Sequence, residues 1–107
     1  MKKSDENTIA KIKETLKAEY QPLRLFLFGS RANGTAKTES DFYFVMVVPI
    51  SKQSSLKEMS KARSLIFKKH DVSADIFIYS EKEFNEWKDE LNSIPETALN
   101  TGKELEL

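Results

Sequence analysis

Cysteine is absent from the 107 residues, which excludes disulfides, thiol catalysis and zinc–thiolate sites. Glycine and proline are scarce, with three of each, and no repeat, low-complexity tract or linker divides the sequence. A chain of this length buries a modest core but offers no room for a separate substrate domain. We therefore expect one domain that covers residues 1–107.

Net charge is absent as well, because 17 basic residues balance 17 acidic ones. A neutral domain attracts a polyanion only weakly at long range, so direct binding of nucleic acid is not expected. The longest apolar run, residues 42–48, is far too short to span a bilayer. The first residues lack the apolar stretch of a secretory signal. These absences predict a cytoplasmic protein without membrane association.

Apolar patterns predict helices and strands in alternation. Ile9, Ile12, Leu16 and Tyr20 form one helical stripe, and the aromatic and β-branched run 42–48 suits a strand buried on both faces. The expected helices cover residues 9–20, 55–69, 80–91 and 95–100, and the expected strands cover residues 23–28, 42–48 and 74–79. The long helix between the second and third strands can serve as a crossover. We therefore expect an α/β or α+β fold, with a small mixed β-sheet and helices packed on it.

The carboxyl-terminal third carries its own start signal. Ser80 and Glu83 have the spacing of a capping box, which predicts a helix that begins there. Phe84, Trp87 and Leu91 form the apolar stripe of that helix. Trp87 is expected in the core, and a partner-binding surface is the alternative. Leu105 and Leu107, which follow the expected helix 95–100, predict a terminal strand or a docked tail.

The polar loop between the first two strands holds the strongest chemical signal. The first strand runs into Gly29 and Ser30, and the second strand opens with Asp41. Glycine has no Cβ, so the backbone can approach a ligand closely at Gly29. Ser30 offers a hydroxyl and an N–H group, and a helix that begins just beyond would direct further N–H groups at phosphate oxygens. A plain turn at the end of a strand is the alternative interpretation.

Two carboxylates flank this loop in the expected sheet. Alternation along a strand places residue 43 on the same face as Asp41. Asp75 lies between apolar residues of the third strand, where an unpaired carboxylate is costly. If the second and third strands are neighbours, Asp41 and Asp75 converge and can bind Mg²⁺ together with phosphate oxygens. Two alternatives remain open: Asp41 only begins its strand, and Asp75 pairs with Arg31 or Lys37.

Two further residues of this region each have two interpretations. Arg31 either contacts phosphates or forms a surface ion pair. Tyr43 either packs as an aromatic residue or places a hydrogen-bonding phenol in a cleft.

Gly29 and Ser30, a gap of ten residues, Asp41 and the later Asp75 form a recognisable spacing. It resembles the signature of the minimal nucleotidyltransferases, within the DNA polymerase beta-like nucleotidyltransferase superfamily. That signature is Gly-Ser, ten residues, Asp-x-Asp, and a third Asp on a later strand. The similarity extends from about Leu23 onward and implies the nucleotidyltransferase (polymerase beta-like) fold.

Tyr43 departs from the signature, because it stands where the family has its second Asp. The family chemistry is nucleotidyl transfer with two metal ions, and the middle carboxylate helps to hold both. A phenol stays neutral at pH 7 and is a poor Mg²⁺ ligand. The resemblance implies a catalytic and metal-binding role for Asp41 and Asp75, the altered catalytic position at Tyr43, and nucleotide binding by Gly29, Ser30, Arg31 and Ser40.

The resemblance also implies a partner. Short chains of this family are typically encoded beside a HEPN-domain protein and act as the antitoxin to that ribonuclease toxin. Active members transfer AMP from ATP to a toxin tyrosine, with Mg²⁺ as cofactor. A hetero-oligomer with a HEPN toxin is thus expected. Tyr43 leaves two functions open: an enzyme whose transfer activity is impaired, and a degenerate domain that blocks the toxin by contact alone.

Overall fold

The computed structural model describes residues 3–36, 40–50 and 55–107. The elements, in chain order, are α1 (Lys3–Tyr20), β1 (Arg24–Phe28), α2 (Ser30–Asn33), β2 (Phe42–Val48), α3 (Ser55–His70), β3 (Ala74–Ser80), α4 (Glu81–Trp87), α5 (Ile94–Thr101) and β4 (Lys103–Leu105). Every helix and strand expected from the sequence is present. Of the two terminal leucines, Leu105 lies in the short strand β4. The short helix α2, directly after Gly29, completes the set.

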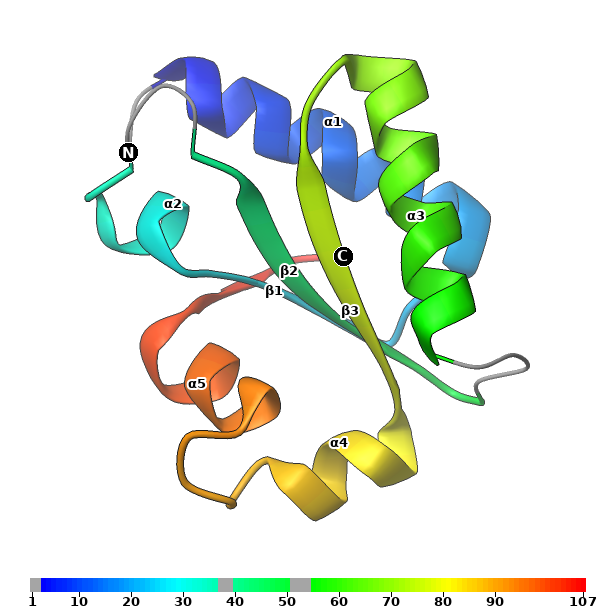
Figure 1. The fold of residues 1–107 in the computed structure, drawn as a ribbon, viewed down its shortest axis with the longest axis vertical. Helices are drawn as coiled ribbons and strands as arrows, with labels where there is room; N and C mark the ends of the chain where they lie inside the picture. The colour runs from blue at the N-terminus through cyan, green and yellow to red at the C-terminus, as the bar shows by residue number, and fades with distance from the viewer. Residues whose placement is uncertain (1–2, 37–39, 51–54) are drawn as a thin grey trace.

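The strands form one sheet in the order β3-β2-β1-β4 (Figure 1). β1 is antiparallel to both β2 and β4, whereas β2 and β3 are parallel. The parallel pair requires a crossover, which α3 provides, so the sheet is mixed as expected. Its register places Phe28 opposite Tyr43, and Tyr43 opposite Asp75. The turn after β1 is thereby brought beside the first residues of β2 and β3.

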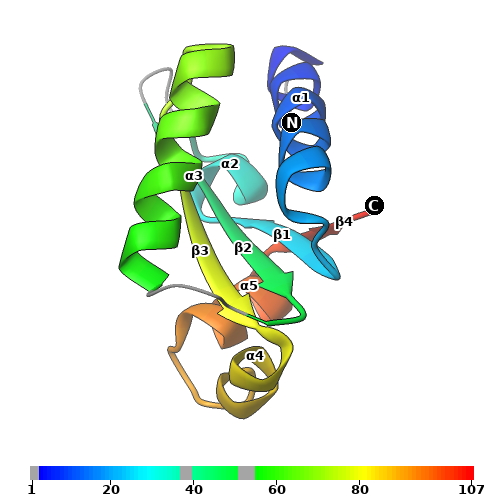
Figure 2. The same cartoon turned by 90° about the vertical axis from the view of Figure 1, so that its right-hand side faces the viewer.

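Helices cover both faces of the sheet. In the two perpendicular views α1 and α3 lie on one face, and α4 and α5 lie on the other (Figures 1 and 2). We call these the α1/α3 face and the α4/α5 face. The period of two along β2 assigns Phe42, Phe44 and Met46 to the first, and Tyr43 and Val45 to the second.

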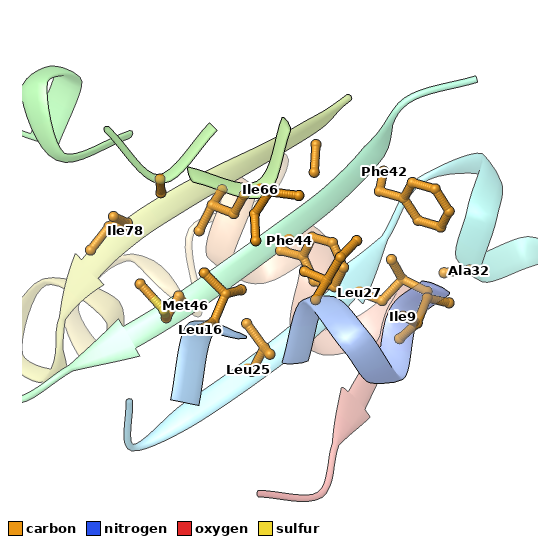
Figure 3. Packing of buried hydrophobic residues seen from close by; sticks show 14 of the residues in the cluster. Ile9, Leu16, Leu25, Leu27, Ala32, Phe42, Phe44, Met46, Ile66 and Ile78 are labelled. Atoms are coloured by element: carbon orange, nitrogen blue, oxygen red, sulfur yellow. The ribbon is translucent and has the colours of Figure 1, made fainter. Parts of the chain in front are cut away.

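The larger core lies on the α1/α3 face (Figure 3). Its members are aliphatic or aromatic and come from both helices and from the three longer strands. They include Ile9, Ile12 and Leu16 of α1, Leu25 and Leu27 of β1, Phe44 and Met46 of β2, Ile66 of α3 and Ile76 of β3. The predicted stripe of α1 is therefore buried, with Tyr20 at its partly buried edge. β2 is apolar on both faces because helices cover both.

The capping box at the start of α4 is confirmed. The Ser80 hydroxyl accepts a hydrogen bond from the Glu83 N–H (3.1 Å), and the Glu83 carboxylate accepts one from the Ser80 N–H (2.9 Å). The prediction that Trp87 is buried was wrong, because its side chain is 51% exposed. α4 ends at Trp87 and is followed by turns, so the stripe does not continue to Leu91. Within the described residues, no helix is long and apolar enough to cross a membrane.

Candidate functional site

Gly29 makes the turn that follows β1. Its φ of 80° and ψ of −160° are accessible to glycine and strongly disfavoured for residues with a Cβ. The Gly29 carbonyl accepts hydrogen bonds from the N–H groups of Ala32 (3.0 Å) and Asn33 (3.2 Å), which start α2. A Cβ at Gly29 would lie 3.2 Å from Cδ2 of Tyr43. The turn therefore needs glycine for its backbone and for the ring beside it.

The two aspartates lie at the same end of the sheet. Asp41 directly precedes β2, where the Phe42 N–H donates to the Ser73 carbonyl (3.1 Å). Asp75 is the second residue of β3 and pairs in register with Tyr43. Regular strand spacing, of 3.3 Å per residue and 4.8 Å between strands, puts the Cα atoms of Asp41 and Asp75 about 8 Å apart. The fold thus places both aspartates at the end of the sheet where the Gly29 turn lies.

Asp75 has a charged partner that the sequence did not single out. Arg63 of α3 donates from Nη1 to Asp75 Oδ1, and the side chains are 44% and 31% exposed, respectively. The alternatives considered from the sequence were Arg31, which pairs elsewhere, and Lys37, which is outside the described residues. The available signal was an arginine inside the otherwise apolar stripe of residues 55–69. Arg63 therefore offsets the negative charge of Asp75 at a partly exposed position.

Arg31 lies on the opposite side of the turn. Its Nη1 is 3.2 Å from each carboxylate oxygen of Asp5, and its Nε and Nη2 donate to the Ser40 carbonyl at 3.2 and 2.7 Å. Its Cζ is 4.4 Å from the ring centroid of Phe42 on the α1/α3 face. With 10% of the Arg31 side chain and 19% of the Asp5 side chain exposed, the two form a partly buried ion pair that ties α1 to the start of β2. Phosphate binding by Arg31 and by Ser40 stays a prediction.

A pocket of about 480 Å³ opens between the sheet and α5, next to the Gly29 turn. Its lining combines aromatic rings with small polar groups: Phe28, Gly29, Asn33, Tyr43, Phe77, Ile94, Thr97 and Thr101. The Phe28 ring contacts two of the other rings in this lining, with centroid distances of 5.9 Å to both Tyr43 and Phe77. The sequence patterns did not predict this pocket, although Thr97 and Thr101 share one face of the expected short helix.

The Tyr79 phenol stands on the same face, two residues beyond Phe77. Burial, and secondarily the charge of Glu83, raises the pKa of Tyr79 above its ordinary value of 10.0. The phenol therefore stays neutral at physiological pH and adds no charge to this side of the sheet.

The donor set limits what metal chemistry the site can support. No group of three histidine or acidic side chains suited to a metal ion occurs among residues 3–36, 40–50 and 55–107. Mg²⁺ is commonly held by one or two carboxylates together with substrate phosphates. Asp41 and Asp75 supply that number of carboxylates. They do not fit a carboxylate-bridged pair of ions, because the residue opposite Asp75 is Tyr43.

The mixed sheet with helices on both faces and a glycine turn after its first strand agrees with the fold expected of a nucleotidyltransferase. The nucleotidyltransferase domain family matches residues 9–91, so the chain belongs to this family. This range contains every residue of the predicted site.

A solved structure supports the fold. A protein of Sulfolobus solfataricus, provisionally described as a nucleotidyltransferase, superposes with a TM-score of 0.55 at 21% sequence identity. The match covers 75% of this chain and 70% of that one. No curated protein sequence matches the chain. The expected fold and the general family are thus confirmed, and the antitoxin role and its partner stay predictions.

Proposed function

We propose that this protein is a nucleotidyltransferase-type antitoxin that modifies a HEPN-domain toxin within a hetero-oligomer. It transfers AMP from ATP to a toxin tyrosine, at a rate that Tyr43 reduces. One observation carries the proposal: the fold of a nucleotidyltransferase family member gathers Gly29, Asp41 and Asp75 at one end of the sheet. Membership of the nucleotidyltransferase family supports the class of reaction. The resemblance to the minimal nucleotidyltransferase signature supports the choice of a HEPN toxin as the partner.

The transfer exchanges one phosphorus–oxygen bond for another. The tyrosine oxygen bonds to the α-phosphorus of ATP, the bond to the bridging oxygen breaks, and pyrophosphate leaves. Asp75 accepts the proton of the tyrosine hydroxyl once it separates from Arg63. The backbone of Gly29 and Ser30 positions the phosphates. Asp41 and Asp75 would hold one Mg²⁺, which when bound offsets the phosphate charge.

Ser40 and Arg31 hold the loop in place in this proposal. Their hydrogen bonds fix the backbone just before Asp41, and the Asp5 ion pair anchors that arrangement to α1. Loss of the middle carboxylate removes a metal ligand that contributes several kcal/mol of transition-state stabilisation, which corresponds to about a thousandfold or more in rate.

The test is transfer of label from [α-³²P]ATP to a co-expressed HEPN partner. Wild type should label the partner slowly, Tyr43→Asp should label it at least a hundredfold faster, and Asp75→Asn should abolish labelling. Labelling by the Asp75→Asn variant at the wild-type rate would contradict the assigned roles. Tyr43→Phe is the matched control, since it keeps the ring and adds no carboxylate, and its rate should equal that of wild type.

A second function is favoured by the surroundings of Asp75. Its carboxylate pairs with Arg63, and the Tyr43 ring stands opposite it. Such a site suits a degenerate domain that neutralises the toxin by contact. Absence of labelling by wild type, with the toxin still neutralised and the Tyr43→Asp variant active, would favour contact. Equal labelling by wild type and Tyr43→Asp would eliminate it.

A further inference from the structure

We propose that the pocket around Phe28 takes the nucleobase of the bound nucleotide, with Tyr43 as a stacking surface. The ligand class is a neutral, flat heteroaromatic ring. The inference rests on the proposed nucleotide-dependent function and assigns to Tyr43 a role that the family signature does not contain.

The pocket has the shape and chemistry of a site for a flat ring. Tyr43 and Phe77 come from neighbouring strands, and each of their rings contacts the Phe28 ring of β1 in a tilted arrangement, with centroids 5.9 Å apart. Aromatic faces bind nucleobases by stacking, with little dependence on base identity. The volume of about 480 Å³ lies in the usual range of small-molecule sites.

The polarity of the lining selects the neutral part of a nucleotide. None of the described residues that line the pocket is charged. A phosphate there would lose its hydration without gaining a cation, so the pocket favours the base over the phosphates. Thr97, Thr101 and Asn33 supply a few polar groups that can orient its ring edge. The Thr101 hydroxyl donates to the Thr97 carbonyl (2.6 Å), so its oxygen remains able to accept a hydrogen bond.

The position of the pocket connects it to the phosphate side of the site. Gly29 and Tyr43 line the pocket and also belong to the end of the sheet that holds the aspartates. A base in the pocket therefore directs the ribose and phosphates past the Gly29 backbone toward Asp41 and Asp75. The replacement that removes the middle carboxylate is the same one that adds a ring to the pocket. Base stacking thus replaces part of the affinity that a second metal ion would provide.

The test is calorimetric titration of the whole chain with adenosine in the presence of EDTA. Adenosine carries no phosphate, and EDTA removes divalent ions, so neither metal nor phosphate contributes to binding. Wild type should bind adenosine, and Tyr43→Phe should bind it within about threefold, because the stacking ring remains. Tyr43→Leu should bind on the order of tenfold or more weakly, because stacking of one base on an aromatic ring contributes about that factor.

A second variant fills the pocket from α5. Thr97→Trp should abolish adenosine binding, and Asn100→Trp, at an exposed position of the same helix outside the lining, should leave it unchanged. Circular dichroism and thermal melting establish that each variant is folded. The inference would be overturned if wild type did not bind adenosine. It would also be overturned if Tyr43→Leu and Thr97→Trp bound adenosine as tightly as wild type does.

The two proposals fail separately. Adenosine binding without transfer of AMP to the partner would retain the base pocket and overturn the transferase. AMP transfer at the wild-type rate by Thr97→Trp would retain the transferase and overturn the pocket. A third outcome is that wild type does not bind adenosine and that Thr97→Trp no longer binds the partner protein. This outcome would assign the pocket to a side chain of the partner and would also overturn the inference.

Discussion

The two faces of the sheet are built differently, although the same strands supply both. On the α1/α3 face, alternate residues of β1, β2 and β3 are buried under two long helices, as Phe44 and Ile76 show. On the α4/α5 face the helices are short, and Phe28 and Phe77 stay partly exposed around the pocket. The first face supplies most of the burial that stabilises the fold. The second leaves a pocket beside its incompletely buried rings.

Each face also has an arginine over an aromatic ring, with different surroundings. Arg31 lies 4.4 Å from the Phe42 centroid on the α1/α3 face and is 10% exposed. Arg24 lies 4.9 Å from the Phe26 centroid on the α4/α5 face and is 38% exposed. We therefore expect the less exposed arginine to contribute more to stability, because solvent screens the contacts of the more exposed one.

The largest effect should follow truncation of a buried aromatic residue on the α1/α3 face, compared with a pocket-lining one on the α4/α5 face. Phe44→Ala removes a fully buried ring, and we expect the free energy of unfolding to fall by about 3–5 kcal/mol. Phe77→Ala, beside the pocket, should lower it by less than about half of that, because little new cavity is created. Urea unfolding measures both. Equal losses would contradict the difference between the faces.

The two arginines provide the next comparison. Arg31→Gln leaves Asp5 with 19% of its side chain exposed and without its cation, which should destabilise the fold by about 2–3 kcal/mol. Arg24→Gln removes a pair whose side chains are 38% and 46% exposed, so less than about 1 kcal/mol should be lost. Thermal melts at low and high salt resolve both. A larger loss of stability for Arg24→Gln than for Arg31→Gln would contradict the expectation that the less exposed ion pair contributes more.

The two glycines with positive φ separate backbone strain from crowding. Gly29→Ala meets both an unfavourable conformation and the Tyr43 ring, and should lower the free energy of unfolding by about 2 kcal/mol. Gly34 has a left-handed conformation, and no atom of the described residues lies within 4 Å of a Cβ added there, so Gly34→Ala should lower it by about 1 kcal/mol. Only Gly29→Ala should also weaken ATP binding. If Gly34→Ala weakened it equally, the turn would not be the site.

The smallest expected effect is a pH dependence at the edge of the sheet. The Arg24 hydrogen bond lowers the pKa of the Glu104 carboxyl below its ordinary value of 4.5. A depressed pKa stabilises the fold above the pKa of the unfolded chain, and this contribution disappears as pH falls through the lower pKa of the folded state. Solvent exposure reduces it to a few tenths of a kcal/mol. Urea unfolding between pH 6 and about 3 should show this component in wild type and not in Arg24→Gln.

The fold followed from the sequence more completely than the site did. The strand over residues 42–48 has the predicted bounds, since its apolar run and the following Pro49 define both ends. The approach of Asp75 to the Gly29 turn required only that the second and third strands be neighbours. In contrast, the Arg63 contact and the α5 wall of the pocket depend on how helices pack around the sheet, which local patterns do not encode.

The wrong prediction has a similar cause. The periodic spacing of Phe84, Trp87 and Leu91 predicts one long apolar stripe. However, α4 ends at Trp87, and both Trp87 and Leu91 are exposed. Periodicity identifies residues that would share a helix face. It does not determine how far the helix continues, which depends here on the turns between α4 and α5.

The most direct measurement is an NMR titration of the isotope-labelled chain with ATP, with and without Mg²⁺. We expect backbone shifts at Gly29, Tyr43, Asp75 and Thr97, with the core residues of the α1/α3 face unaffected. The chain offers a competing location, because a second, larger pocket lies near Tyr20, Lys61 and Lys68. Shifts confined to that pocket, or absent at saturating ATP, would contradict a nucleotide site on the α4/α5 face.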